Sequence, residues 1–409
     1  MAIREQFEIT GGMKKWGLGL LGVGLLALVM GIFTLGASND EHEVARFWSV
    51  LLQNSVFFLL VVNSAMFFIC ATTLAMGGWQ LSFRRVSEAV SSVVPVFAIL
   101  AGVVLLAIVF GHQHHIYHWI DHEVVENDPV LKGKSGFLNP TFFTIWTVIT
   151  LVLWSVLGAK MRKISQNSDR TGKMNKEEGA KFIWKNTIWA SLFLVFFGLT
   201  VASTIPWLWI MSIDAHWYST MFSWYTFASA FVSGVALMTL FVVYLKNKGY
   251  LEYVNKEHIH DLGKFMFAFS IFWTYLWFSQ YMLIWYANIP EETVYFKLRV
   301  QGPYKGLFFF NLLINFIAPL LILMSRTSKR NYTVVTIMSV LIIFGHWIDF
   351  FLMVAPSVQK EHFHLNWFDF GIMFLYVGMI ILLVGRALTK HKLNPVNHPF
   401  FKESIIHHT

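Results

Sequence analysis

Ten runs of predominantly apolar residues follow one another along the chain, and each is long enough to cross a lipid bilayer. A helix of about 20 such residues spans roughly 30 Å of hydrocarbon, and lipid offers no other partner for backbone amides. Only 13% of the 409 residues are charged, against about 25% in soluble domains. The sequence therefore predicts an all-α polytopic membrane protein. The predicted transmembrane helices lie near residues 16–36, 47–76, 89–111, 141–160, 186–211, 221–245, 265–287, 305–325, 332–354 and 367–388.

Positive residues are divided unevenly between the two faces that ten crossings define. An even number of crossings puts both termini on one side, and that side receives 24 of the 31 Lys and Arg residues, including Arg4, Arg84, Arg85 and the eight from Lys160 to Lys185. The positive-inside rule then predicts that both termini are cytoplasmic. The net charge of +8 follows from this topology, so we expect no nucleic acid partner. The opposite face keeps seven basic residues: Arg46, Lys132, Lys134, Lys297, Arg299, Lys305 and Lys360.

The first run and the cysteine content limit processing and cofactors. Residues 1–20, MAIREQFEITGGMKKWGLGL, lead into a full apolar run without a small-residue cleavage site, so we expect a retained membrane anchor. The single cysteine, Cys70, rules out an internal disulfide, a CxxCH haem attachment and an all-cysteine iron-sulfur cluster. We therefore expect this chain to bind no redox cofactor, and any such metal centre to belong to a partner subunit.

Histidines collect at the ends of the runs and in loops. Axial ligation of a b-type haem needs histidines that project inward from the middles of facing helices, and we find none there. The stretch GHQHHIYHWIDH, residues 111–122, offers zinc ligands but no cysteine and no second ligand pair. We favour an interfacial histidine-rich loop over a metal site.

The tetrapeptide HWID occurs twice, at His118 to Asp121 and at His346 to Asp349. In a helix, positions i and i+3 share a face, so each His and Asp would approach the same neighbour. Both copies are expected toward the outer face, because the third and ninth runs both cross outward. A carboxylate inside the bilayer costs at least ~2.5 kcal/mol near the centre. We therefore interpret His346 and Asp349 as a proton or substrate site. Their outer-face neighbours are predicted to be Asp369, His118, Asp121, Asp214 and His216.

Other polar residues in the runs are compatible with two roles. Amides and hydroxyls both donate and accept hydrogen bonds, so they suit a water-lined proton path. They suit packing between membrane helices equally well, and both interpretations stay open. These candidates are Thr336, Ser339, Asn311, Asn315, Gln280, Tyr281, Asn54 and Asn63.

Histidine beside a carboxylate is the kind of pair that quinol chemistry needs. Oxidation of a quinol releases two protons with its electrons, and His is the base whose ordinary pKa lies near neutrality. The carboxylate stabilises the imidazolium and passes its proton to water. The sequence thus supports a quinone-site hypothesis in which the electrons leave through a partner subunit.

Three segments carry a resemblance to a known family: DAHWYSTMFSWYTFASAFVSG (214–234), FWTYLWFSQYMLIWYANIPEETVYF (272–296) and FGHWIDFFLMVAP (344–356). They resemble the NrfD-like membrane subunits of alternative complex III, a bacterial quinol:cytochrome c oxidoreductase. Within them the run SQYMLIWYANIPEET is specific in sequence as well as in composition, and the similarity extends over nearly the whole chain.

The resemblance implies a fold, a location and partners. It implies an N-terminal segment with the first span (1–46), two four-helix bundles (47–211 and 212–354), and a tenth span with a cytoplasmic tail (355–409). It also implies the bacterial inner membrane, a paralogous NrfD-like subunit, an iron-sulfur subunit and haem-c subunits, with lipids and a terminal oxidase as further candidate partners.

The length of this chain resembles the shorter of the two paralogues. Because the longer one is expected beside the iron-sulfur acceptor, this chain is not expected to be catalytic alone and serves as a quinone pocket, a proton path or both. The alternatives are a proton- or ion-translocating module or scaffold without quinone, and a solitary transporter.

Overall fold

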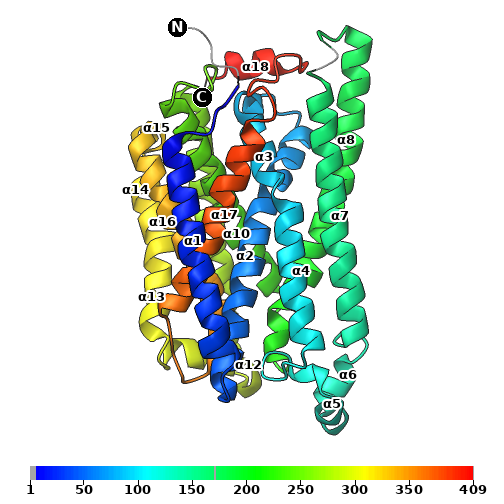
Figure 1. Ribbon diagram of the computed structural model, residues 1–409, viewed down its shortest axis with the longest axis vertical. Coiled ribbons are helices and arrows are strands. Elements are labelled where there is room, and N and C mark those ends of the chain that lie inside the picture. Colours follow the sequence, from blue (N-terminus) through cyan, green and yellow to red (C-terminus); the bar gives the residue numbers. More distant parts are fainter. Residues whose placement is uncertain (1–5, 170–171, 409) are drawn as a thin grey trace.

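The computed structural model describes residues 6–169 and 172–408, and within these ranges the chain consists of helices and connecting loops without a strand (Figure 1). This confirms the predicted all-α class. Arg4 and Arg170, which entered the charge count, lie outside the described residues. The α-helices are α1 (Gly11–Gly31), α2 (Glu41–Leu74), α3 (Arg84–Ser91), α4 (Val94–Phe110), α5 (His122–Asn127), α6 (Pro129–Lys134), α7 (Pro140–Asn167), α8 (Lys176–Leu199), α9 (Ile205–Trp209), α10 (Met221–Asn247), α11 (Lys256–Ala287), α12 (Pro290–Val300), α13 (Lys305–Leu312), α14 (Ala318–Leu323), α15 (Arg326–Arg330), α16 (Tyr332–Gln359), α17 (Trp367–Leu388) and α18 (Phe401–Ile405).

Several of the apolar runs fold as more than one element. Short π-helical segments, η1 (Ile32–Gly36), η4 (Thr200–Thr204) and η6 (Leu313–Ile317), continue α1, α8 and α13. In the described ranges, nine helical segments are long and apolar enough to cross a membrane: Gly11–Gly36, Glu41–Leu74, Trp79–Phe110, Pro140–Asn167, Lys176–Trp209, Met221–Asn247, Lys305–Leu323, Tyr332–Gln359 and Trp367–Leu388. They coincide with nine of the ten predicted runs. The structure therefore supports a multi-pass membrane protein.

The remaining run, 265–287, lies in α11. This helix has 32 residues and packs along α10. Its Trp, Tyr and Gln side chains make it less apolar than the other nine segments.

Both ends of the described chain lie at the same end of the helix bundle. Gln6 Nε2 donates to the carbonyl of Thr389 beyond α17 at 2.9 Å, and Asn255 Nδ2 donates to the carbonyl of His407 at 3.1 Å. Figure 1 shows α18 at this end, whereas α5, α6 and α12 lie at the opposite end. We call the first the inner end and the second the outer end, following the prediction from Lys and Arg.

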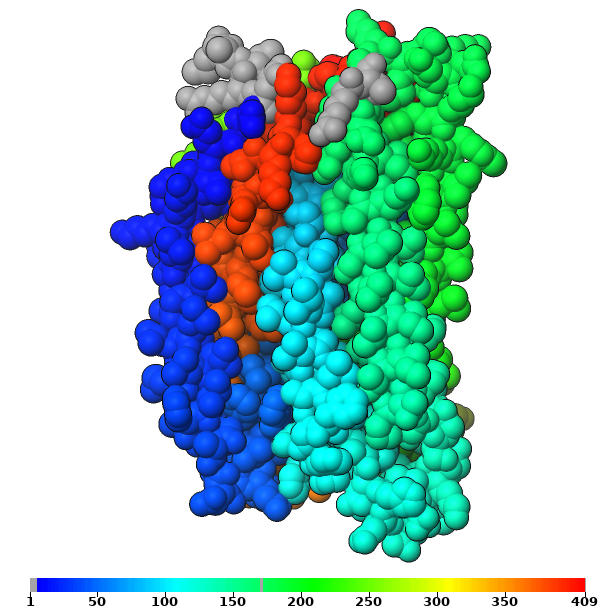
Figure 2. All heavy atoms as spheres, turned by 45° about the vertical axis from the view of Figure 1, so that its right-hand side comes forward, coloured from blue at the N-terminus to red at the C-terminus, as the bar shows by residue number. Residues whose placement is uncertain are grey.

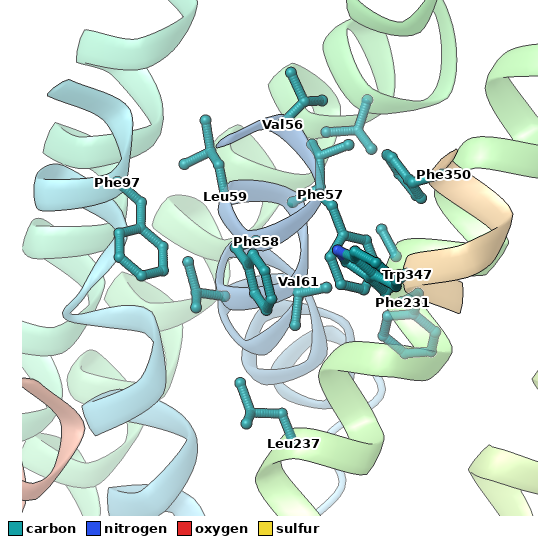
Figure 3. Packing of buried hydrophobic residues seen from close by; sticks show 14 of the residues in the cluster. Val56, Phe57, Phe58, Leu59, Val61, Phe97, Phe231, Leu237, Trp347 and Phe350 are labelled. Carbon is teal, nitrogen blue, oxygen red and sulfur yellow. The ribbon is translucent and has the colours of Figure 1, made fainter. Parts of the chain in front are cut away.

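The helices α2 and α10 form the centre, since most of their residues are buried. Figure 3 shows Phe57 and Phe58 of α2 facing Trp347 and Phe350 of α16 on one side and Phe97 of α4 on the other. The Phe57 and Phe350 ring centroids are 5.0 Å apart. These aromatic contacts hold α16 against the centre and fix which face of α16 is turned toward α10.

Glycines spaced by seven residues join α1 to α17. Gly17, Gly24 and Gly31 of α1 face a matching series on α17, Gly371, Gly378 and Gly385. A Cβ atom added at Gly24 would lie 2.4 Å from Cα of Leu375, and one at Gly378 would lie 2.6 Å from the backbone nitrogen of Leu21. Because seven residues make about two helical turns, each series lies on one face and lets the two backbones approach closely.

Candidate functional site

The centre of the site is a carboxyl group and an imidazole on α16, both fully buried. Nδ1 of His346 lies 3.8 Å from Oδ2 of Asp349. One helical turn separates the two residues, so their side chains project from the same face, as their spacing predicts.

The pair lies deeper in its helix than we predicted. His346 lies midway along α16, at the fifteenth of its 28 residues, and not toward the outer end. The predicted span stops at residue 354, whereas the helix continues to Gln359 through Pro356. The interpretation that no histidine lies in the middle of a span was therefore wrong for His346.

Three side chains from three other helices donate hydrogen bonds to Asp349. The hydroxyl of Tyr225 on α10 donates to Oδ1. Asn311 on α13 donates to the same oxygen at 2.8 Å, and the indole N–H of Trp273 on α11 donates to Oδ2 at 2.9 Å. A buried carboxylate is tolerated when its oxygens accept such bonds. Four helices therefore converge on one acidic group.

His346 is held by α10 and keeps one ring nitrogen free of protein partners. Oγ of Ser229 lies 2.9 Å from Nδ1, and the Trp273 ring packs against the imidazole with centroids 5.3 Å apart. Nε2 is buried and has no hydrogen-bond partner among the described residues. An imidazole with one nitrogen near a carboxylate and the other unbonded is suited to accept and release a proton.

A small cavity of about 20 Å³ is lined by Tyr225 and Asn311, two of the side chains that donate to Asp349. A buried water needs at least about 10–15 Å³ of such space, so this cavity has room for one water. The ring of a quinone needs more space than this cavity provides, and therefore a quinone does not fit next to Asp349 in this structure. The lining includes Tyr225, Gln280, Tyr295, Arg299 and Asn311.

Arg299 of α12 closes the outer side of this cavity, and a proline explains why it is there. Pro356 has no N–H, so the carbonyl of Leu352 four residues earlier lacks its usual helical donor. Arg299 Nε donates to that carbonyl at 2.8 Å, and Nη2 lies 3.4 Å from Oγ of Ser357. The guanidinium also lies 3.4 Å from the centre of the Tyr295 ring.

Beyond Arg299 a large cavity opens at the outer end, with a volume of about 1210 Å³. We call it the vestibule. Its lining includes Ser357, which Arg299 contacts, and the predicted residues His118, Asp214 and His216. Polar groups thus lead from Asp349 through Tyr225, the small cavity and Arg299 to the vestibule.

The first HWID copy does not form the predicted pair. His118 belongs to a 3-10 turn, His118–Ile120, and Asp121 is extended and caps α5 by accepting from the N–H of Glu123 at 2.9 Å. The helical i, i+3 relationship is therefore wrong here, because α4 ends at Phe110 and His112 takes a left-handed φ of 49°. Burial, together with nearby Lys360, lowers the pKa of His118.

Other outer-face candidates lie apart from the buried pair. Asp214 ends a short 3-10 helix, and His216 Nε2 lies 2.5 Å from Oδ2 of Asp128. This hydrogen bond is the main cause of the lowered pKa of Asp128. Both predicted residues belong to the vestibule wall.

Asp369 stabilises the start of α17. Its Oδ2 accepts from the backbone N–H of Asn366 at 3.0 Å, which completes a capping box, and lies 3.3 Å from Nη2 of Arg46. The structure does not bring this carboxyl group to His346 and Asp349.

The proton-path candidates divide into three groups. Thr336 and Ser339 donate to carbonyls of α16 itself, and Asn54 accepts from the indole N–H of Trp347 at 2.9 Å, on another face of that helix. Asn63 is buried without a hydrogen-bond partner among the described residues. The members close to the site are Asn311, Asn315, which donates to Asn311 at 2.6 Å, Gln280 in the cavity wall, and Tyr281, which stacks on Trp277 next to it.

Sequence reasoning missed Tyr225, Ser229, Trp273 and Arg299. Tyr225 and Ser229 are four residues apart and therefore share a face of α10, a signal hidden among many small and aromatic residues. The link between Arg299 and Pro356 has no signal in the sequence, since it depends on how α12 folds back.

Within residues 6–169 and 172–408, no group of three or more His, Cys, Asp or Glu side chains is arranged to hold a metal ion. No model of a known protein family matches the chain, and no curated protein matches it.

Proposed function

We propose that this chain is a membrane subunit of a quinol-oxidising respiratory assembly, in which Asp349 and His346 relay protons to the outer side. The observation that carries the proposal is a fully buried carboxyl group that lies 3.8 Å from an imidazole and accepts a hydrogen bond from Tyr225, with polar groups leading from it to the vestibule. An ionisable residue deep in a membrane protein is costly and marks a proton or substrate site.

A proton relay fits this geometry better than a structural ion pair does. In an ion pair that only stabilises, the buried charges are matched by permanent opposite charges. Here, the three side chains that donate to Asp349 are neutral, and a protonated His346 would balance its charge. One proton shared by the two groups keeps the pair neutral overall, and this proton can move between them.

The residues around the pair would have distinct tasks. Tyr225 contacts Asp349 and also lines the small cavity, so its hydroxyl is placed to pass a proton to a water there. Arg299 separates that water from the vestibule. Its positive charge would repel other cations that approach the small cavity from the vestibule. Asp214 and His216 in the vestibule wall would then accept protons near bulk water.

We further propose that α11 is the tenth span and that α2 to α9 and α10 to α16 supply the two bundles. Nine crossings would leave the chain ends on opposite sides, whereas Gln6 and His407 contact residues at one end. The 32 residues of α11, at about 1.5 Å each, are long enough to cross. The Lys and Arg distribution supports an inner end that faces the cytoplasm.

The proposal of a respiratory assembly rests on the resemblance of residues 214–234, 272–296 and 344–356 to NrfD-like subunits. Iron-sulfur and haem-c centres would belong to partner subunits. The cavity beside Asp349 has no room for a quinone ring, so quinone binding by this chain is the second candidate. The vestibule favours quinone binding, because its volume of about 1210 Å³ exceeds the roughly 300–1,000 Å³ of typical small-molecule sites and leaves room for such a molecule.

Purification of the chain from its native membrane with an affinity tag tests the assembly. We expect co-purifying subunits with c-type haem absorbance, and a chain that purifies alone contradicts this part. Photo-crosslinking with an azidoquinone then separates the candidates. Labelling confined to other subunits supports the proton relay alone, whereas labelling of the vestibule wall supports quinone binding here.

Proton transfer is tested in the same purified assembly. Infrared difference spectra recorded across a pH titration should contain a carboxylic acid signal that Asp349→Asn removes. A signal that survives this substitution contradicts a role for Asp349 as the proton carrier.

A further inference from the structure

A second polar site lies at the inner end, remote from Asp349. A groove of about 200 Å³ runs between α3, the end of α7 and the segment that follows α17. Figure 2 shows α17 and the segment that follows it, orange to red, beside α4 and α7 in the upper part of the molecule. The groove is lined by Arg85, Glu88, Gln166, Lys390 and His391, together with apolar residues.

The charges around the groove leave a positive excess. Glu88 is shared by Arg84, at 3.1 Å, and Arg85, and the carboxylate of Asp169 lies 2.6 Å from Arg85. These two acids balance two of the cations. Two more cations remain. Arg162 donates to the carbonyl of Ser91 at 3.0 Å, and Lys390 forms no ion pair in the described part of the chain.

Arg85 is built into the groove wall. Its side chain is 3% exposed. Arg85 Nη1 donates to the hydroxyl of Ser165 at 3.2 Å, and Nη2 donates to the carbonyl of the same residue at 3.3 Å. Its Nε is buried without a hydrogen-bond partner among the described residues. A buried donor without an acceptor is costly, and an anion in the groove would supply that acceptor. Burial is the main cause of the lowered pKa of nearby His391; Arg85 and Lys390 lower this pKa further, whereas Glu88 and Asp169 raise it.

The groove lies at the depth where helices leave the hydrocarbon. It is formed where α7 ends at Asn167 and α17 ends at Leu388. Its volume is many times that needed for one water, so a phosphate group fits. Basic pockets between membrane helices on the cytoplasmic side are the kind of site that binds anionic headgroups.

We propose that this groove binds a phosphate group, supplied by the headgroup of an anionic phospholipid in the inner leaflet. Arg85 and Lys390 would contact the phosphate oxygens, Gln166 would donate a hydrogen bond, and the apolar wall of Ala387 and Leu388 would lie against the start of an acyl chain. The site does not depend on the proposed proton relay.

Native mass spectrometry of the full chain in detergent tests the proposal. Phosphatidylglycerol and phosphatidylcholine with identical acyl chains are added separately, and the lipid-bound fraction is compared. We expect retention of phosphatidylglycerol over phosphatidylcholine and a roughly fivefold loss of phosphatidylglycerol affinity in Lys390→Gln. Lys390 is exposed, so this substitution leaves folding intact. Gln166→Glu, which adds a negative charge to the groove, should weaken binding as well.

Lys402→Gln is the matched control, because Lys402 is also exposed at the inner end but does not line the groove. Equal retention of the two lipids, or equal effects of the Lys390 and Lys402 substitutions, would overturn the proposal. Inorganic phosphate distinguishes the source of the phosphate group. A melting shift by phosphate in the wild type but not in Lys390→Gln, without lipid retention, supports a phosphate site that is filled by the free ion.

Discussion

The hydroxyl of Tyr225 on α10 donates a hydrogen bond to Oδ1 of Asp349 on α16. The same residue also lines the small cavity. Tyr225 therefore connects the fully buried Asp349 carboxyl group to a space that has room for one water. This relationship makes the Asp349 cluster more than a packing contact, because a hydroxyl between a carboxyl group and a water can both donate and accept a proton.

Replacement of Asp349 by asparagine should stop proton transfer while the fold persists. The amide has the same shape and still accepts from Tyr225, but it has no exchangeable acid proton. We expect proton-coupled turnover of the intact assembly to fall by about 10²–10⁴-fold. Ser339→Ala is the control, because this buried hydroxyl donates to its own helix at 2.8 Å. Unchanged turnover in Asp349→Asn would remove the relay from this chain.

Tyr225→Phe should lower both stability and the rate of proton transfer. The substitution removes a hydrogen bond to a charged group, which is worth about 1.5–3 kcal/mol. Denaturant unfolding in detergent measures the loss of stability, and proton-coupled turnover of the assembly measures the loss of proton-transfer rate. Tyr275→Phe, whose side chain is 61% exposed, should change neither. A Tyr225→Phe protein that behaves like this control would contradict the assigned role.

Arg299 and Pro356 should be energetically coupled. Arg299→Met leaves the Leu352 carbonyl without a donor and should cost about 1–3 kcal/mol. Pro356→Ala supplies a backbone N–H for the same carbonyl, so the cost of Arg299→Met should be smaller in that background. A double-mutant cycle on unfolding free energy should give a coupling of at least about 0.5 kcal/mol. Additive effects would show that Arg299 does not compensate for the proline.

The close contact of α1 with α17 should fail when a side chain is added at Gly24. Cβ of a new valine would lie 2.4 Å from Cα of Leu375, and overpacking of this kind costs about 1–3 kcal/mol. Gly22→Val is the matched control, since no atom lies within 4 Å of a Cβ at that position. Gly24→Val should unfold at a lower temperature than Gly22→Val, and a protease should release its first helix more readily. Thermal unfolding and limited proteolysis measure the two effects. Equal behaviour would contradict the contact.

Acid should loosen the segment after α17 through His398. Burial, Arg84 and Arg85 lower the pKa of His398 from 6.5 to about 3. Its Nδ1 accepts from the N–H of Phe400 at 3.2 Å, and protonation would remove this acceptor. A free tail takes up the proton below pH 6.5, whereas the docked tail does so only near 3. Docking is therefore strongest above pH 6.5 and weakens as the pH falls toward 3.

Hydrogen exchange of residues 390–408 measured between pH 7 and 5, after correction for the intrinsic exchange rate, checks this expectation. His398→Gln should abolish the extra opening at low pH, and His408→Gln, at an exposed position, should retain it. If His408→Gln lost the pH dependence and His398→Gln kept it, the effect would belong to His408 and the expectation for His398 would be wrong.

The two HWID copies show what local sequence predicts and what it does not. At His346 the apolar neighbours on both sides continue the helix, and the i, i+3 spacing correctly predicts the approach to Asp349. At His118 the preceding Gly111 and His112 end α4, so the same four residues form a turn and a cap. Helix ends depend on backbone conformation several residues away.

The partners of Asp349 were beyond prediction. Tyr225 and Trp273 are 124 and 76 residues away along the chain, and many other Tyr and Trp residues occur in the spans. Which of them reaches the carboxyl group depends on the rotation of α10 and α11 about their axes, which packing sets.

The sequence by itself determined that the chain folds into apolar helices, because backbone amides in lipid must bond within their own segment. It also determined which end is basic, and that His346 and Asp349 share a face. Only the tertiary structure decided that the pair lies midway along α16, that three distant donors surround Asp349, and that Arg299 lies between a small cavity and the vestibule. These features arise from the way side chains of different helices fill the space between them, and the order of residues along one helix does not specify that arrangement.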